Sequence, residues 1–283
     1  MQNRHYAIRS MNREEVDYAI NWAASEGWNP GLHDASCFYQ ADSEGFLIGL
    51  LGDEPVACIS VVKYGTTFGF LGFYIVKPEY RGKGYGLSIW NAGMTRLQSR
   101  TVGLDGVIAQ QENYKKSEFR LAYRNIRYEG SGRGDYFSDS DIVELNSIPF
   151  ESVAEYDKPF FPDDRKIFLK CWINQKEGTV LGIMNAGKLS GYGVIRRCRK
   201  GYKIGPLFSD TPIYAEKLFS ALQATIPAGE PVFLDIPEVN QGALDLVNRH
   251  NMHVVFETAR MYTGNPPDLP VQKIYGITTF ELG

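Results

Sequence analysis

Residues 81–86 read Arg-Gly-Lys-Gly-Tyr-Gly and strongly constrain the structure around them. An apolar stretch at 68–76 precedes this segment, and a stretch with apolar residues three and four positions apart follows it. Glycines at 82, 84 and 86 let the backbone approach a ligand closely and turn its N–H groups toward it. The start of the following helix adds the positive end of its dipole. The sequence therefore predicts a strand–loop–helix unit that holds a pyrophosphate, with Arg81 and Lys83 adding charge at the rim.

Two other glycine-rich phosphate loops do not fit this segment. A dinucleotide-binding fold requires the spacing GxGxxG within a βαβ unit, whereas these glycines alternate. A Walker loop requires Ser or Thr after Gly-Lys, whereas Gly84 follows Lys83. The alternative is a glycine-rich turn that binds nothing. Three glycines at a helix start lower stability through their loss of conformational entropy on folding, which favours a binding role.

The order of elements around the loop is also informative. A strand at 6–9 and a helix that starts after Asn12 are followed by strand patterns at 45–51, 56–63 and 68–76, which predict an antiparallel meander. After the loop we expect a helix, a strand at 102–105, a helix at 107–117 and a strand at 119–128. A similar order returns after the glycine-rich segment 130–134, which predicts a duplicated fold.

These residues together resemble the GNAT superfamily of N-acetyltransferases. Its acetyl-CoA motif is a strand, a Pro and an R/Q-x-x-G-x-G/A loop before a helix, and Val76, Pro78 and residues 81–86 match it. The family also has a Tyr followed four and five residues later by Gly-Phe. Here Tyr114 and Phe119 have that spacing, with Glu118 in place of the usual Gly.

The resemblance covers residues 1–130 well and extends to a two-domain bacterial subgroup. Its second, degenerate domain carries a stretch similar to 191–196 and 205–208. It implies an α/β (α+β) fold of tandem GNAT domains, each a mixed, largely antiparallel twisted sheet flanked by helices. We expect a catalytic domain at 1–130, a linker at 131–140 and a degenerate domain at 141–283. Asp210 stands where a second phosphate loop would lie and would repel a pyrophosphate, so we expect one CoA site.

The resemblance implies transfer of an acetyl group from acetyl-CoA to a primary amine, most simply of a small molecule. The amine attacks directly, through a tetrahedral intermediate, while strand N–H groups stabilise the oxyanion. Tyr114 is the implied general acid, because a phenol is matched to a departing thiolate. The implied cofactor-binding residues are Tyr74, Ile75, Val76, Arg81, Gly82, Lys83, Gly84, Tyr85 and Gly86.

The general base and the acceptor site are less defined. Glu26, Asp34 and Glu112 are carboxylates in segments that should border the cleft, and for each of them a solvated surface position is the simpler interpretation. Trp28, Asn29 and His33 fall in the loop that covers the acceptor in this family. Trp28 could equally be a core residue.

Composition excludes several other classes. The formal net charge is −3 without a basic patch, which argues against nucleic-acid binding. Residues 1–15 contain no apolar run, and the longest apolar stretch is too short to cross a bilayer, so we expect a cytoplasmic protein without membrane contact. The four cysteines lack CxxC spacing and are expected to be reduced packing residues. No metal is expected, and the protein should be a monomer or a homodimer.

Two alternatives to an N-acetyltransferase stay open at this point. A CoA-binding regulator without turnover would keep the loop and lack a base. A transferase that uses aminoacyl-tRNA would share the tandem architecture, although the acidic composition and the intact acetyl-CoA loop count against it.

Overall fold

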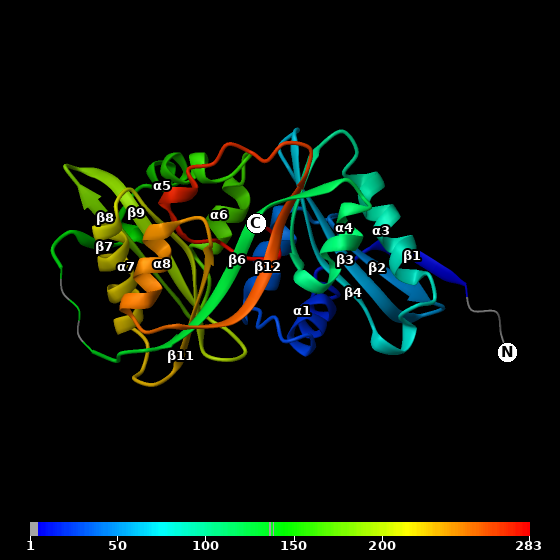
Figure 1. Ribbon diagram of the computed structural model, residues 1–283, viewed down its shortest axis with the longest axis horizontal. Coiled ribbons are helices and arrows are strands. Elements are labelled where there is room, and N and C mark those ends of the chain that lie inside the picture. Colours follow the sequence, from blue (N-terminus) through cyan, green and yellow to red (C-terminus); the bar gives the residue numbers. More distant parts are fainter. Residues whose placement is uncertain (1–4, 136, 138) are drawn as a thin grey trace.

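The computed structural model describes residues 5–135, 137 and 139–283. Its centre is one 13-stranded sheet in the order β1-β2-β3-β4-β5-β12-β6-β11-β10-β9-β8-β7, with β13 paired to β10. Helices cover both ends of this sheet (Figure 1). Most neighbouring strands are antiparallel, and β4–β5 and β10–β11 are parallel pairs. The fold is thus the mixed, largely antiparallel sheet flanked by helices that the sequence predicts.

The first half follows the predicted order closely. Its strands and helices are β1 (Tyr6–Ser10), α1 (Val16–Ser25), α2 (Asp34–Ala41), β2 (Phe46–Leu51), β3 (Glu54–Tyr64), β4 (Phe68–Val76), α3 (Tyr85–Arg96), β5 (Thr101–Val107), α4 (Gln111–Lys115) and β6 (Phe119–Ser131). Sequence analysis missed α2, and the helix expected at 107–117 is shorter because a 3₁₀ turn, Ile108–Gln110, precedes α4.

The second half repeats this order. It consists of β7 (Ile142–Glu144), α5 (Phe150–Asp157), α6 (Lys166–Trp172), β8 (Gly178–Asn185), β9 (Lys188–Arg197), β10 (Tyr202–Ser209), α7 (Pro212–Ala224), β11 (Pro231–Pro237), α8 (Gln241–Arg249), β12 (His253–Thr263) and β13 (Ile274–Gly276). Part of the expected linker, residues 136 and 138, lies outside the described residues. Gly132 and Gly134 donate backbone hydrogen bonds to Glu230 and Ile226.

Two long strands join the halves in the middle of the molecule. β12 lies between β5 and β6, and β6 pairs on its other side with β11 (Figure 1). A strand from late in the chain thereby completes the sheet around the first half. Residues 277–283, which follow β13, are buried beside this junction, where the C-terminal end lies at the centre of the molecule.

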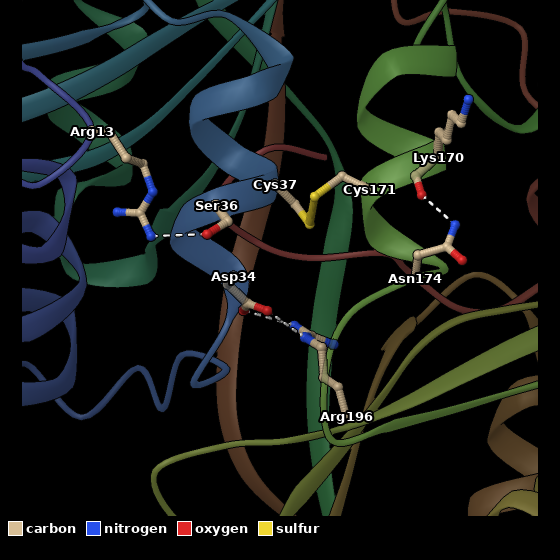
Figure 2. Close-up of a disulfide and its surroundings, with 8 residues drawn as sticks. All are labelled: Arg13, Asp34, Ser36, Cys37, Lys170, Cys171, Asn174 and Arg196. Carbon is tan, nitrogen blue, oxygen red and sulfur yellow. Dashed lines mark hydrogen bonds and ion pairs between the residues drawn. A yellow bond between two sulfur atoms is a disulfide. The ribbon is translucent and has the colours of Figure 1, made fainter.

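The prediction that all four cysteines are reduced is wrong. Cys37 of α2 and Cys171 of α6 form a disulfide with a Cα–Cα distance of 5.2 Å (Figure 2). The packing of α2 against α6 brings together residues 134 positions apart, which no local spacing could indicate. Cys58 and Cys198 are free and buried, as packing residues should be.

A buried ion pair reinforces the same contact between the halves. Arg196 Nε donates to Asp34 Oδ1 at 2.8 Å, and both side chains are almost fully buried (Figure 2). No helix in the described part of the chain is long and apolar enough to cross a membrane.

Candidate active site

The predicted loop forms an open cradle at the start of α3. Gly82 and Gly84 adopt φ values of +74° and +86°, in the left-handed region that favours glycine. A Cβ added to either would meet no atom within 4 Å, so the cradle has free space beside it. Gly84 precedes the first residue of α3 and has no side chain to cap it. The first N–H groups of the helix therefore suit an anion.

Arg81 adds a positive charge at the rim of this cradle. Its Nη2 lies 2.5 Å from Glu26 Oε1, and its Nε donates to the carbonyl oxygen of Val76 at 2.8 Å. The side chain is half exposed. Lys83 Nζ donates to the carbonyl of Glu79 at 2.7 Å. Arg81 is thus held beside the cradle. A phosphate could replace its ion-pair partner, the carboxylate of Glu26.

β4 and β5 separate next to the cradle. Their parallel pairing runs from Phe68 with Thr101 to Leu71 with Leu104 and ends there. Beyond it, a bulge against β3 places Phe73 at a φ of +45°, and Cys58 Sγ donates to the Phe73 carbonyl at 3.1 Å. The rest of β4 consequently has backbone groups that face away from β3 without a β5 partner.

This separation opens a cavity of about 570 Å³, which is in the range of small-molecule sites. β4, the cradle and β5 form three of its walls, and β12 and the segment after β13 close it. The lining residues are Glu26, Trp28, Leu71, Gly72, Phe73, Tyr74, Ile75, Val76, Arg81, Gly82, Gly84, Gly86, Leu87, Leu104, Asp105, Gly106, Val107, Gln110, Tyr114, Phe256, Thr258, Phe280 and Glu281.

Most of the predicted cofactor-binding residues line this cavity. Those present are Tyr74, Ile75, Val76, Arg81, Gly82, Gly84 and Gly86. Lys83 and Tyr85 are not among the lining residues. Tyr85 instead packs its ring against Tyr6, with 4.7 Å between the centroids. Arg81 and the three glycines thus line the cavity, whereas Lys83 and Tyr85, which lie between the glycines, do not.

Tyr114, the predicted general acid, also lines the cavity. Its ring stacks on Trp90 with the centroids 5.7 Å apart, and a Cβ at Gly106 would lie 2.2 Å from it. Burial raises the pKa of the Tyr114 phenol above its usual range. A phenol is already protonated at neutral pH, and the raised pKa makes Tyr114 a weaker acid than a free tyrosine, so the expected match to a departing thiolate is reduced.

The three predicted base candidates lie in different environments. Glu26 lines the cavity and is paired with Arg81. Asp34 is fully buried away from the cavity lining and paired with Arg196. Glu112 is a surface residue whose partner is Lys115, at 2.6 Å. Only Glu26 therefore reaches the cavity.

The predicted acceptor-binding residues are also divided. Trp28 lines the cavity, and its carbonyl accepts from Arg127 Nη1 at 2.7 Å. Asn29 instead bonds the backbone of Lys200 through both side-chain atoms. His33 lies 3.2 Å from Glu177. Asn29 and His33 thus contact the second half of the chain rather than the cavity.

Sequence analysis missed the residues that close the far end of the cavity. Phe256 and Thr258 come from β12, and Phe280 and Glu281 come from the segment after β13. Thr258 is buried, and its hydroxyl has no partner among the described residues. No motif marks these positions, because only the insertion of β12 beside β5 brings them to the cavity.

Two family models match the chain. The family model described as Acetyltransferase (GNAT) family matches residues 11–117, and the model described as Acetyltransferase (GNAT) domain matches residues 153–276. A protein of Pseudoalteromonas sp. named holothin acyltransferase is 34% identical over 283 residues, which cover 100% of this chain and 96% of that protein.

Solved structures agree with these matches. A putative acetyltransferase from Pyrococcus horikoshii superposes with a TM-score of 0.83 at 26% identity, covering 100% of this chain and 97% of that one. A tandem GNAT protein from the clavulanic acid biosynthesis pathway has a TM-score of 0.63 at 11% identity, covering 93% and 100%. At that identity it shows the fold alone.

Proposed function

The chain belongs to the GNAT family of acyltransferases, with two GNAT domains in tandem, and we propose that it transfers an acetyl group from acetyl-CoA to the primary amine of a small molecule. The observation that carries this proposal is the glycine cradle at the start of α3, which opens into the cavity between β4 and β5. The relative named holothin acyltransferase supports acyl transfer as the reaction class.

The cradle and the separated strands fit the two ends of acetyl-CoA. Backbone N–H groups at Gly82–Gly84 and the start of α3 would hold the pyrophosphate, with Arg81 releasing Glu26 to pair with it. When bound, acetyl-CoA supplies a thioester that an amine can attack. The N–H groups of β4 that lack a β5 partner would face its carbonyl oxygen, and one such donor is worth about 3 kcal/mol in a transition state.

Tyr114 is the group of this chain that would protonate the departing sulfur. Its phenol holds a proton at neutral pH, as an ordinary tyrosine does, and burial raises the pKa further. The stacked Trp90 and the close Gly106 fix the ring, so that the hydroxyl is held in one place. A positioned proton donor of this kind contributes about 10²–10⁴-fold to a rate.

The far end of the cavity supports a small acceptor with an apolar body. Trp28, Phe256 and Phe280 provide aromatic walls there, and Thr258 and Glu281 provide polar groups. Because β12 and residues 277–283 close this end, it offers a compact chamber rather than a groove for a polypeptide. We propose that residues 1–130 hold the acyl-CoA site and that residues 141–283 hold none, while β12 and the final segment help to enclose the acceptor.

A screen for thiol release tests this function. Purified protein would be incubated with acetyl-CoA and a panel of primary amines, with the Arg81→Glu variant in parallel. We expect acetylation of at least one amine and loss of this activity in the variant, because the reversed charge repels the pyrophosphate. Acetyl-CoA binding without turnover of any amine would instead favour a CoA-binding regulator. Unchanged acetyl-CoA affinity in the variant would contradict the site.

A further inference from the structure

The aromatic walls at the far end of the cavity come from three separate segments of the chain. Trp28 follows α1, Phe256 lies in β12 and Phe280 follows β13. Trp28 and Phe256 are half-buried, so each keeps exposed surface. Because these segments are far apart in the sequence, no local structure fixes the three walls relative to one another.

Arg127 of β6 contacts all three walls from behind and is not itself among the lining residues. Its Nη1 donates to the carbonyl oxygen of Trp28 at 2.7 Å. Its guanidinium carbon lies 4.8 Å from the ring centroid of Phe280 and 5.8 Å from that of Phe256. A planar guanidinium is attracted to the face of an aromatic ring. Arg127 therefore joins the backbone of one wall to the rings of the other two.

The second half of the sheet fixes the orientation of Arg127. In the strand register, Arg127 lies opposite Asp235 of β11 on one side and opposite Phe256 of β12 on the other. A register shift between Val254 and Phe256 produces the second of these pairings. Asp235 accepts from Arg127 Nε at 2.6 Å and from Nη2 at 2.7 Å, and both side chains are almost fully buried. Two parallel hydrogen bonds of this kind fix the plane of the guanidinium.

The loop that carries Trp28 is also fixed to the second half, through the next residue. Asn29 has a φ of +52°, which side chains rarely adopt. Its Nδ2 donates to the carbonyl of Lys200 and its Oδ1 accepts from the Lys200 N–H, both at 2.9 Å. Lys203 Nζ donates to the Asn29 carbonyl at 2.9 Å. The turn between β9 and β10 thus holds this loop in the conformation that brings Trp28 to the cavity.

Resting on the proposed function, we infer that Arg127 and Asn29 are positioning residues for an acceptor amine with an aromatic body. Arg127 holds the aromatic walls together, and Asn29 sets the direction of Trp28. Neither lines the cavity, so each acts through the walls. Because Asp235 and Lys200 anchor them, the half to which we assign no acyl-CoA site shapes the acceptor site of the other half.

A purely structural role is the alternative, and Arg165 provides the matched case. Its Nε and Nη2 donate to the two oxygens of Asp157 at 2.8 and 2.7 Å, and its guanidinium carbon lies 4.6 Å from the ring centroid of Phe161. Arg165 and Asp157 are buried as deeply as Arg127 and its partner. None of these three residues lines the main cavity. Arg165 therefore reproduces the packing of Arg127 without the contact with the acceptor walls.

The test compares primary amines with and without an aromatic body, with acetyl-CoA as donor. Benzylamine and phenethylamine form the first set, and methylamine and ethylamine form the second. Arg127→Lys keeps the charge but loses the paired hydrogen bonds and the stacking, so it should raise KM about 10-fold or more for the aromatic set. KM for the small amines, and kcat for both sets, should change less than about threefold.

A second variant and two controls separate positioning from stability. Asn29→Gly removes both side-chain hydrogen bonds and tolerates the positive φ, so it should raise KM for the aromatic amines about threefold or more. Asn251→Gly is its control, since Asn251 is exposed and has a φ of +51°. Arg165→Lys should lower the urea midpoint as much as Arg127→Lys does. Neither control should change KM for either set of amines.

Four results decide the outcome. Acetyl-CoA affinity in Arg127→Lys should stay within about twofold of wild type, which shows that the variant is folded. If it does not fold, Asn29→Gly carries the test. Equal rises in KM for both sets of amines, or the same rises in the controls, would mean a structural role and overturn the inference. Wild-type protein that acetylates only the small amines would also overturn it and leave the proposed function intact. Acetyl-CoA binding without acetylation of either set would contradict the proposed function itself.

Discussion

The two halves of the sheet contain the same junction and fill it differently. In the first half, β4 and β5 stop pairing after Leu71 and Leu104, and the space beyond is the cavity. In the second half, β10 and β11 stop pairing after Ile204 and Leu234, but there β13 pairs with β10. The chain itself therefore occupies the place that we assign to the acyl group of acetyl-CoA in the first half.

The contacts of this segment show how completely it fills the second junction. The Ile277 N–H donates to the carbonyl of Asp235 at 2.9 Å. A Cβ at Gly205 would lie 2.6 Å from the carbonyl oxygen of Thr278, so the backbones touch. The same segment then continues to Glu281 and enters the first junction. The segment from β13 to Glu281 thus fills the junction of the second half and lines the cavity of the first half.

The turn before α3 leaves the start of its helix open, whereas the turn before α7 closes it with side chains. Before α3, Gly82 and Gly84 leave the helix start open. Before α7, Thr211 caps the helix by accepting from the N–H of Tyr214 at 3.2 Å. Asp210 pairs there with Lys273 at 3.1 Å. The second half thus has a cap and an acidic side chain where the first half has an open helix start, so we expect no phosphate site before α7.

The largest expected effect comes from closing the cradle. Gly84→Asp should weaken acetyl-CoA binding at least about 100-fold. The new carboxylate would remove charge-assisted hydrogen bonds between the pyrophosphate and the N–H groups at the start of α3, and it would add a negative charge beside the pyrophosphate. Gly187→Asp is the matched control, since Gly187 has a φ of +75° and free space in a turn of the second half. Calorimetric titration should find normal affinity in the control. Equal affinity of the two variants for acetyl-CoA would contradict the assignment of the acetyl-CoA site to the first half.

The disulfide tests how firmly the halves are joined. Replacing Cys37 and Cys171 together by Ser should lower the free energy of unfolding by about 3 kcal/mol, because the cross-link restricts the unfolded chain. Urea denaturation measures this change. Acetyl-CoA affinity should stay the same, since neither cysteine lines the cavity. A loss of affinity would show that the first half needs the second for binding as well as for stability.

A pair of buried tyrosines separates chemistry from stability. Tyr114→Phe should lower kcat about 10- to 100-fold with unchanged acetyl-CoA affinity. Tyr192 of the second half donates to Asp157 at 2.5 Å, so Tyr192→Phe should cost about 1–2 kcal/mol of stability and leave kcat unchanged. Initial rates and thermal unfolding of both variants provide the comparison. A normal kcat in Tyr114→Phe would remove its role as the acid.

The smallest effect is expected at Asp210. Asp210→Asn removes the charge that would repel a phosphate, yet it should not create a second acetyl-CoA site, because β13 still fills the junction behind it. The stoichiometry of binding in the variant is the readout. A second equivalent of acetyl-CoA would show that charge alone had silenced the second half.

Local patterns predicted most of the elements and the cradle. Residues 68–76 and the helix after Gly84 are fixed by hydrophobic spacing and glycine placement, which act within a few residues of the chain. The cavity-lining role of Tyr74, Arg81 and Tyr114 followed from matching one motif, so it too was local.

Features that depend on distant partners could not be predicted. The pattern of β12 indicates a strand but not its position between β5 and β6. Glu281 lines the cavity only because β12 lies between β5 and β6 and residues 277–283 are buried beside it. Cys37 and Cys171 meet through helix packing alone. Pairing across the fold is set by the whole core rather than by any segment.

The central claim is that this tandem protein has one acyl-CoA site, in its first half. Calorimetric titration of the wild-type protein with acetyl-CoA, beside the Arg81→Glu variant, tests it most directly. We predict one equivalent bound per chain and loss of that binding in the variant, because Arg81 lies at the rim of the cradle. Two equivalents per chain, or undiminished binding by the variant, would contradict the account.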